Sequence, residues 1–248
     1  MNTITLLTVT FVILLLSSSD AFLSQSNLTA ALSVSMEMMV KTIKQLINMP
    51  PYQSNKPIGP ILFDFTDPKT ELDKWKEVSD TARTEGRSKA TLVPQVASVE
   101  LSISNILLLL NPQPNGACFA GVDYLLDNWD LSQYKGISID LHRQGEVSGF
   151  KLIFYDNCSD IFTCPSYESF FETTGGRQQI ELAFSTFAPY FRGFPKPDAQ
   201  PLDLTKLSRF GIQAYGGVNA IRKQYGPGSI ELFTVTVYKE TKTPEQTN

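Results

Sequence analysis

The sequence contains a single histidine, His142, and only three cysteines among its 248 residues. Ser-His-Asp and Cys-His arrangements both need a histidine beside the nucleophile. His142 follows Ile139 and Leu141 in an alternating, strand-like segment, and no acid is placed by sequence to orient it. Metal-ligand clusters are absent as well, because Cys158 and Cys164 have no second pair. We therefore predict no catalytic residue, no metal and no other cofactor.

The chain also lacks an excess of basic residues and any long run of one charge. Lys and Arg number 21 against 25 Asp and Glu, so the formal net charge is -4 at pH 7. A nucleic-acid partner is not expected, because such proteins carry a basic stripe or patch. No Gly-rich turn leads into a Lys-Ser/Thr pair that opens a helix, so no phosphate-binding loop is present. Acids such as Asp64 and Asp67 suit turns better than a glycosidase pair.

The N-terminal leader carries most of the information on location. Residues 6–16 are apolar but too few to cross a bilayer, which takes about 20 residues. Small residues follow, and the pattern predicts a secretory signal peptide over residues 1–21, with no stable membrane span after cleavage. No Arg precedes Arg83, whereas mitochondrial leaders are Arg-rich. The predicted location is secreted or in the endomembrane lumen. A mitochondrial location, an uncleaved anchor and a misread start are the alternatives.

Two further patterns fit an oxidising compartment. Asn27 and Asn157 each begin an acceptor sequence for N-glycosylation. Cys158 and Cys164 are close enough in sequence to bridge the loop between two strands, and otherwise they are reduced thiols. A bridge at Cys158 would compete with glycosylation at Asn157, so Asn27 is the preferred acceptor. Cys118 is left over and is expected to be a small buried residue.

The segments that flank the main domain differ from it in composition. Residues 22–60 contain an apolar stripe at helical spacing over residues 28–48, and this predicts one N-terminal amphipathic helix. A proline-rich linker follows from Pro50 to residue 60. The stripe packs against the domain or docks a partner. The polar tail, residues 239–248, is predicted to be disordered.

Residues 61–238 show roughly ten short strand patterns separated by turn residues, which predicts an all-β sandwich or jelly roll. The apolar run 106–110 predicts a strand buried on both faces. Residues 126–134 are expected to be a polar connection. A change of phase between Leu232 and Phe233 predicts a β-bulge.

The stretch from Gly149 to Gly193 is expected to be the centre of the sandwich. It alternates as strand, cysteine-bracketed loop, strand, turn, strand and a corner ending on glycine. Inward and outward positions can be assigned within the third of these strands. Ile180, Leu182 and Phe184 are expected to face inward, and Gln179 and Glu181 outward.

Several motifs occur in a fixed order along the chain. They are Trp75-Lys-Glu-Val-Ser-Asp80 with Gly86-Arg-Ser88, then Gly116-Ala-Cys-Phe-Ala120, Leu131-Ser-Gln-Tyr-Lys-Gly-Ile137, Tyr167 to Phe171, and Ile180 to Gly193. This order resembles the complex I intermediate-associated protein 30 family, whose domain is a galactose-binding-like jelly roll. The resemblance covers about residues 61–238. It implies a non-enzymatic, chaperone-like role in assembly of respiratory complex I (NADH:ubiquinone oxidoreductase).

This sequence departs from the family pattern in several places. Glu85-Gly86 stands where the family has two glycines, and Ala183 stands where it has proline. Arg177 or Gln178 takes the place of a tryptophan. The secretory leader does not fit a role in the mitochondrial matrix. The resemblance therefore bears more strongly on the fold than on the function.

Because no catalytic or cofactor site is predicted, the expected activity is the binding of a ligand. Aromatic side chains offer flat faces to a sugar or peptide, and arginines supply donors. The candidate ligand-binding residues are Trp75, Asp80, Arg87, Ser88, Tyr124, Trp129, Tyr155, Arg177 and Arg192, with Tyr215 as a further aromatic. The alternative is that the aromatics pack in the core and the arginines pair with surface acids.

The sequence thus predicts a non-enzymatic binding or chaperone-like protein of the secretory pathway. A protein partner is expected first and a carbohydrate second. One alternative is a mitochondrial complex I assembly factor. The other is an extracellular carbohydrate-binding module, which an exposed row of Trp75, Trp129 and tyrosines would favour.

Overall fold

The structure is a computed structural model, and it describes residues 41, 57, 59–82, 85–96, 102–114, 116, 118–217, 220 and 222–239. The predicted signal peptide, Asn27, nearly all of the predicted helix and linker, and the tail from residue 240 lie outside these residues. Within the described part of the chain, no helix is long and apolar enough to cross a membrane.

The described chain is built from β-strands, joined by turns and short 3-10 helices. The elements are β1 (Ile61–Asp64), η1 (Leu72–Lys74), β2 (Trp75–Ser79), η2 (Asp80–Ala82), β3 (Lys89–Val96), β4 (Ser102–Leu110), β5 (Phe119–Trp129), β6 (Gly136–Gly145), β7 (Gly149–Asp156), β8 (Ser166–Glu172), β9 (Arg177–Ala183), η3 (Phe184–Thr186), β10 (Ala188–Phe191), β11 (Phe194–Pro195), β12 (Leu207–Tyr215) and β13 (Gly226–Tyr238). This confirms the predicted all-β class.

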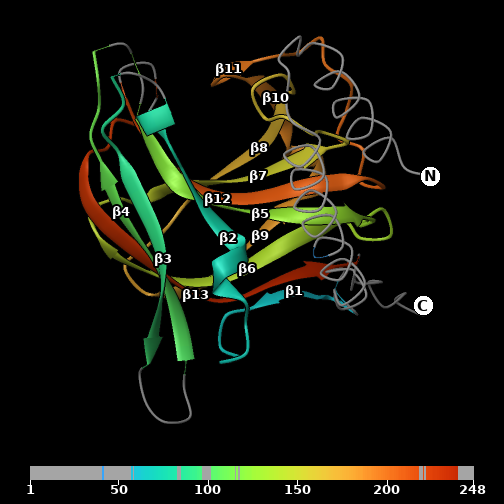
Figure 1. Ribbon diagram of the computed structural model, residues 1–248, viewed down its shortest axis with the longest axis horizontal. Coiled ribbons are helices and arrows are strands. Elements are labelled where there is room, and N and C mark those ends of the chain that lie inside the picture. Colours follow the sequence, from blue (N-terminus) through green and yellow to red (C-terminus); the bar gives the residue numbers. More distant parts are fainter. Residues whose placement is uncertain are drawn as a thin grey trace, which may run out of the picture. The chain divides into compact units, whose positions relative to one another are not determined.

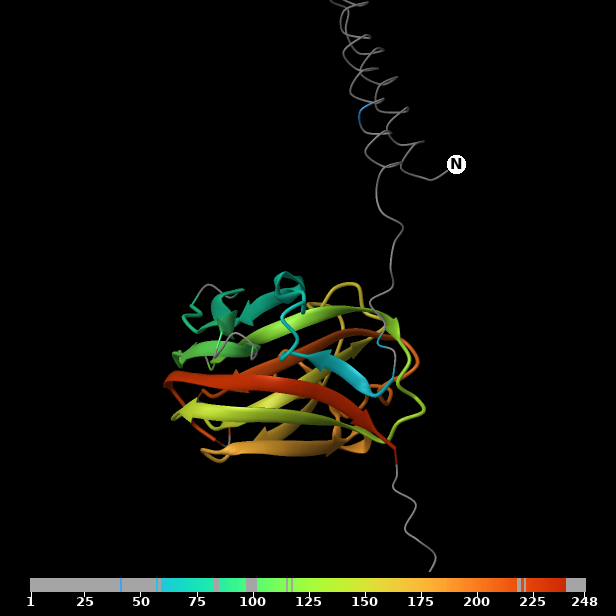
Figure 2. The same cartoon turned by 90° about the horizontal axis from the view of Figure 1, so that it is seen from below.

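The strands pair into two antiparallel sheets. The six-stranded sheet has the order β3-β4-β13-β6-β9, and β1 also pairs with β13. The seven-stranded sheet has the order β11-β10-β8-β7-β12-β5-β2. Figure 1 shows β7, β12 and β5 side by side in the seven-stranded sheet. Figure 2 shows β13 in red beside β6 in yellow-green in the other sheet.

The core takes apolar side chains from both sheets and has an aromatic cluster around Phe63 of β1. The Phe63 ring centroid lies 4.8 Å from Trp75, 5.1 Å from Tyr124 and 5.6 Å from Phe210. Because β1 belongs to the six-stranded sheet and its three partners to the seven-stranded sheet, these contacts join the two sheets. Each aromatic pair contributes about 0.5–1.5 kcal/mol beyond the area it buries.

Two bulges set which side chains point inward. The β13–β6 register shifts between Leu232 and Thr234, which makes Phe233 an extra residue and confirms the predicted bulge. The register of β12 shifts between Leu207 and Arg209. Leu207 and Phe210 are both buried in the core, so the irregularity leaves Arg209 pointing away from it.

The central stretch has the predicted order of elements, and its loop carries the predicted disulfide. Cys158 and Cys164 are bonded, with their Cα atoms 6.1 Å apart. Cys118 is buried, as expected, and burial raises the pKa of its thiol to about 11. Strands β7 and β8 pair in the seven-stranded sheet, whereas β9 crosses to the six-stranded sheet and pairs with β6.

Two sequence-based predictions are wrong. Residues 106–110 are not buried on both faces, because Leu107 and Leu109 are 46% and 44% exposed whereas Leu108 is 6% exposed. The strand has one face in the core and one face outward. Residues 126–129 are not part of a polar connection but the end of β5, where Trp129 is 2% exposed.

Paired substitutions on β4 test this one-sided burial. We expect Leu108→Ala to lower the free energy of unfolding by about 3 kcal/mol, because it leaves a cavity in the core. Leu107→Ala, one residue away on the outward face, should lower it by less than about 1 kcal/mol. Urea unfolding of both variants measures the difference. Equal losses would mean that both faces of β4 are covered.

Candidate functional site

The three sequence-predicted aromatic candidates Trp75, Tyr124 and Trp129 lie in the core. They are 6%, 8% and 2% exposed, and the rings of Trp75 and Tyr124 contact each other at 5.3 Å. Their faces are covered by neighbouring rings, so they stabilise the sandwich rather than face solvent. A carbohydrate-binding module would have been favoured by an exposed row of Trp75, Trp129 and tyrosines. This row is not formed, because Trp75 and Trp129 are buried.

Asp80 and Ser88 form a fully buried hydrogen-bond network. The Asp80 carboxylate accepts bonds from the Ser88 backbone N–H at 2.8 Å and the Ser88 hydroxyl at 2.6 Å. It also accepts one from the Phe119 N–H at 3.3 Å, and the Ser88 Oγ accepts one from the Asn111 N–H. The network ties η2 to the entries of β3 and β5 and to the end of β4. Its role is architectural, because no atom of either residue reaches solvent.

The three arginine candidates are far apart in the fold. Arg87 is exposed beside the Asp80 network. Arg177 lies on the outer side of the six-stranded sheet, where it pairs with Asp140 at 2.7 Å and stacks 3.7 Å above the Phe233 ring. Arg192 has a φ of 54° and forms the two-residue turn between β10 and β11 with Gly193, whose φ is 84°. Left-handed values at both positions are those of a type I′ hairpin turn, which glycine favours.

His142 has a partner that the sequence did not reveal. Its Nδ1 lies 2.7 Å from the Glu231 carboxylate on β13, and its Nε2 lies 3.1 Å from the Gly175 carbonyl. The β6–β13 register places His142 directly opposite Glu231. These contacts link β6, β13 and the turn before β9, and they occupy both ring nitrogens.

The outer side of the seven-stranded sheet gathers a different set of residues, among which only Tyr155 and Tyr215 were sequence candidates. Phe210, Phe154 and Tyr124 point into the core, so the residues that alternate with them point outward. We call this surface the polar face. Its polar and aromatic residues include Asp123, Lys151, Tyr155, Glu168, Phe170, Tyr190, Arg209, Gln213 and Tyr215, and Leu125, Ile153 and Glu172 also point outward from these strands.

Two ion pairs lie at the middle of the polar face. Lys151 Nζ on β7 is 2.7 Å from Glu168 Oε2 on β8, and the two side chains are 10% and 5% exposed. Arg209 Nη1 on β12 is 2.6 Å from Asp123 Oδ2 on β5, with side chains 21% and 8% exposed. Such low exposure is unusual for charged residues on the outside of a sheet, and pairing is what makes it tolerable.

The ionisation of the neighbouring groups reflects this shielding. Burial raises the pKa of Tyr155 to about 12, the Glu168 charge adds to the rise, and the Arg209 charge opposes it. Burial also raises the pKa of Asp123, while the Arg209 guanidinium lowers it. Tyr155 therefore keeps its hydroxyl proton at neutral pH and remains a hydrogen-bond donor.

Three aromatic rings line one side of the polar face. The Phe170 ring on β8 lies 5.5 Å from Tyr190 on β10 and 4.9 Å from Tyr215 on β12, with both tyrosines edge-on to it. Phe170 is 40% exposed, and the Lys151 ammonium lies 5.7 Å from its ring centroid. The arrangement presents apolar ring surface next to charged hydrogen-bonding groups.

A glycine lies next to the ion pairs. Gly211 on β12 lies between Ile153 and Asp123 in the pairing of the three strands. Gly211 is buried, and a Cβ built on it would lie 3.4 Å from the Val122 carbonyl oxygen, 3.6 Å from Asp123 Cβ and 3.7 Å from Ile153 Cβ. The neighbouring side chains therefore shield the backbone of β12 at this point.

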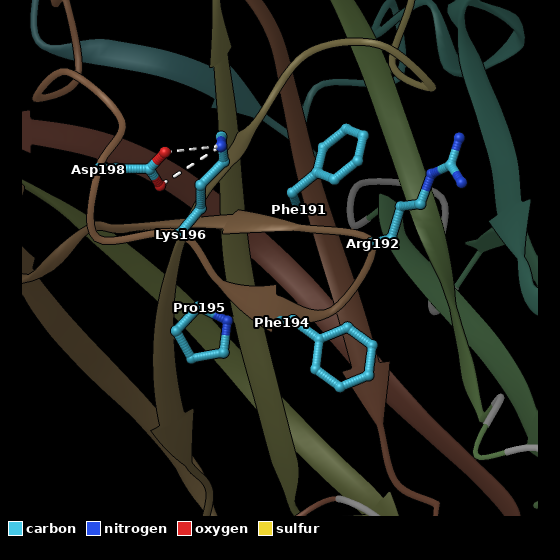
Figure 3. A pocket seen from close by; sticks show the side chains of 6 residues that line it. All are labelled: Phe191, Arg192, Phe194, Pro195, Lys196 and Asp198. Atoms are coloured by element: carbon cyan, nitrogen blue, oxygen red, sulfur yellow. Dashed lines mark hydrogen bonds and ion pairs between the residues drawn. The ribbon is translucent and has the colours of Figure 1, made fainter.

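A hollow of about 400 Å³ lies at the β10–β11 hairpin (Figure 3), and none of the four residues of the two ion pairs lines it. It is lined by Phe191, Arg192, Phe194, Pro195, Lys196 and Asp198. Lys196 and Asp198 pair with each other, but their side chains are 39% and 76% exposed. Exposed ion pairs of this kind contribute little to stability, so nothing holds the charged groups of the hollow in a fixed arrangement. The ion pairs of the polar face are shielded and fixed, and we therefore take the polar face as the candidate site. The described residues include no group of three or more His, Cys, Asp or Glu that could hold a metal ion.

Sequence reasoning missed most of the polar face. Lys151, for example, stands between buried Phe150 and Leu152, and Arg209 stands just before buried Phe210. A charged residue inside an apolar strand was the available signal. Its partner could not be found from spacing, because Arg209 and Asp123 are 86 residues apart in the chain.

The fold and the polar face define a β-sandwich protein of the binding type. The family model for Complex I intermediate-associated protein 30 (CIA30) matches residues 63–232, which is more than half of the chain. The chain belongs to this family. Family membership and fold together support a non-catalytic module.

A curated relative and two solved structures are also similar. An uncharacterized protein of Schizosaccharomyces pombe is 27% identical over 117 residues, which are 44% of this chain and 53% of that protein. The chain thus spans about half the length of this relative. The Family 11 carbohydrate-binding module of Clostridium thermocellum, in complex with a β-1,3-1,4-mixed-linked tetrasaccharide, has a TM-score of 0.55 at 14% identity, covering 74% of this chain and 97% of the module.

The second structure is the Family 11 module of the cellulosomal cellulase Lic26A-Cel5E of Clostridium thermocellum. Its TM-score is 0.54 at 14% identity, and the match covers 76% of this chain and 99% of the module. At this identity the likeness concerns the fold alone. It agrees with the jelly-roll architecture predicted from the sequence.

Substitution of Gly86 tests the architectural role of the Asp80 network. A Cβ at Gly86 would lie 1.8 Å from the Asp80 carbonyl oxygen, so Gly86→Ala must displace the network. We expect the free energy of unfolding to fall by at least about 2 kcal/mol. Gly176→Ala is the control, because no atom lies within 4 Å of its Cβ position. Thermal unfolding of both compares them, and a harmless Gly86→Ala would contradict the network.

Proposed function

We propose that this protein is a non-catalytic binding protein of the secretory pathway and that its ligand binds at the polar face. The observation that carries the proposal is the two shielded ion pairs beside the exposed Phe170 ring and the half-buried Tyr190 and Tyr215 rings on an outward sheet surface. Core packing does not require charges there, because the outward side of a sheet is satisfied by solvated polar groups. Pre-arranged donors and acceptors beside aromatic rings are the usual composition of a ligand site.

The proposed location rests on several features. The leader pattern of residues 1–21 and the acceptor at Asn27 are typical of secreted chains. The bond between Cys158 and Cys164 supports an oxidising compartment, since disulfides are rare in the cytosol. Asn157 is exposed but directly precedes the bridged Cys158, so we expect Asn27 to carry the glycan.

Two ligand classes follow from the comparisons. The family name refers to an association with a complex I intermediate, which favours a protein partner. A module of similar fold was solved with a tetrasaccharide, which makes carbohydrate the other class. The second candidate function, assembly of mitochondrial respiratory complex I, is favoured by the family name and requires a mitochondrial location instead.

An endoglycosidase mobility shift on protein from the cell of origin tests the location. We expect a shift that is lost in Asn27→Gln and kept in Asn157→Gln, because only the first acceptor is free of a neighbouring disulfide. Subcellular fractionation accompanies the assay. An unshifted protein in a protease-protected mitochondrial fraction would contradict the secretory location and favour complex I assembly.

Site-specific photocrosslinking tests the polar face as the binding surface. A photoreactive phenylalanine replaces Phe170 in the full chain, expressed in the cell of origin. The same residue at Leu109, which is 44% exposed on the other sheet, is the control. We expect adducts from position 170 and not from position 109. Adducts from position 109 alone would place the ligand on the six-stranded sheet.

A further inference from the structure

The balance of charge and aromatic surface on the polar face indicates what class of ligand it takes. We infer that the polar face binds a neutral carbohydrate chain. This inference rests on the function proposed above, because it names the ligand of the same site. It selects carbohydrate over protein, and neutral chains over charged ones.

The first step concerns charge. Each acid of the polar face is paired with a base. Glu168 pairs with Lys151 and Asp123 with Arg209, and Glu172, the next outward residue of β8, pairs with Arg222. An anionic ligand would meet Glu168 and Asp123, and a cationic ligand would meet Lys151 and Arg209. Either one would lie against a like charge that the pair holds in place, and separating the pair to avoid this repulsion would leave a buried charge uncompensated. A neutral ligand leaves both pairs intact.

The second step concerns hydrogen bonding. A hydroxyl group both donates and accepts, and the paired groups supply both functions side by side. A guanidinium has five N–H donors and an ammonium three, while a carboxylate has about four acceptor sites, so each pair uses only part of its capacity. Bonds from these charged groups are stronger than bonds between neutral groups. Gln213 and the protonated Tyr155 hydroxyl lie among them.

The third step concerns the aromatic rings. Phe170 lies between Tyr190 and Tyr215, which stand edge-on to it at 5.5 and 4.9 Å. The rings therefore form a bent, partly exposed apolar surface bordered by hydroxyl groups. A sugar ring has an apolar C–H face and a rim of hydroxyls, and it matches an aromatic face next to polar groups.

The same composition argues against a protein partner at this face. The centre of a protein–protein interface is apolar and depleted of charged residues, and charges lie at its rim. On the polar face the charges lie at the centre, and the rings lie to one side of them. A protein partner of this composition would be centred on the rings, with the ion pairs at its rim.

Affinity electrophoresis of the full mature protein tests the inference. Native gels contain one polymer each: mixed-linked β-glucan, arabinoxylan or galactomannan as neutral chains, polygalacturonate or heparin as anionic ones, and chitosan as a cationic one. We expect retardation by at least one neutral polymer. Phe170→Ala should weaken it about tenfold through loss of the ring contact, and Phe170→Tyr should keep it. Phe194→Ala removes a ring that is more exposed, at 64% against 40% for Phe170, from the β10–β11 hollow and should have no effect.

The possible outcomes separate the inference from the proposed function. Retardation by charged polymers only, if lost in Phe170→Ala, would keep the polar face as a binding site and overturn the neutral ligand. Retardation lost in Phe194→Ala but not in Phe170→Ala would move the site to the hairpin and overturn both. No retardation by any polymer would overturn the carbohydrate inference. Photocrosslinking from position 170 would then still show whether a ligand of another class binds at the polar face.

Discussion

The aromatic cluster around Phe63 is the contact on which the rest of the structure depends. Its partners Trp75, Tyr124 and Phe210 come from three neighbouring strands of the opposite sheet. A strand alternates its side chains between two faces, so inward rings fix what points outward. Burying Tyr124 and Phe210 therefore orients the adjacent Asp123 and Arg209 away from the core. The core and the candidate site are two sides of the same strands.

This coupling constrains the chemistry of the polar face. The bulge at Leu207–Arg209 adds one residue to β12. Leu207 and Phe210 therefore both point into the core although they are three positions apart, and Arg209 between them points outward. The arginine is then held between strands where its charge is largely shielded. Shielded charges are tolerated only with partners, and Asp123 on the next strand supplies one. The face is consequently pre-arranged, with little freedom for its charged groups to reorient when a ligand binds.

Local patterns in the sequence predicted the local structure well. Alternation identified Ile180 and Leu182 as inward residues, a phase change identified the bulge at Phe233, and close spacing identified the Cys158–Cys164 bridge. Properties that depend on contacts between residues far apart in the chain could not be predicted from the sequence. The crossing of β9 to the other sheet and the Arg209–Asp123 pair are set by tertiary contacts. Three aromatic candidates, Trp75, Tyr124 and Trp129, lie in the core instead, because large rings serve core packing more often than binding.

The family motifs and the polar face have different physical roles. Asp80, Gly86 and Ser88 close a buried network, and the Arg192–Gly193 pair closes a hairpin turn. Both requirements are set by backbone geometry, so they are independent of any ligand. The polar face instead uses outward positions, where a substitution changes chemistry without disturbing the core. A chain can therefore keep the buried network and the hairpin turn and still bind a different ligand, provided that each acid on the outer sheet surface keeps a base beside it.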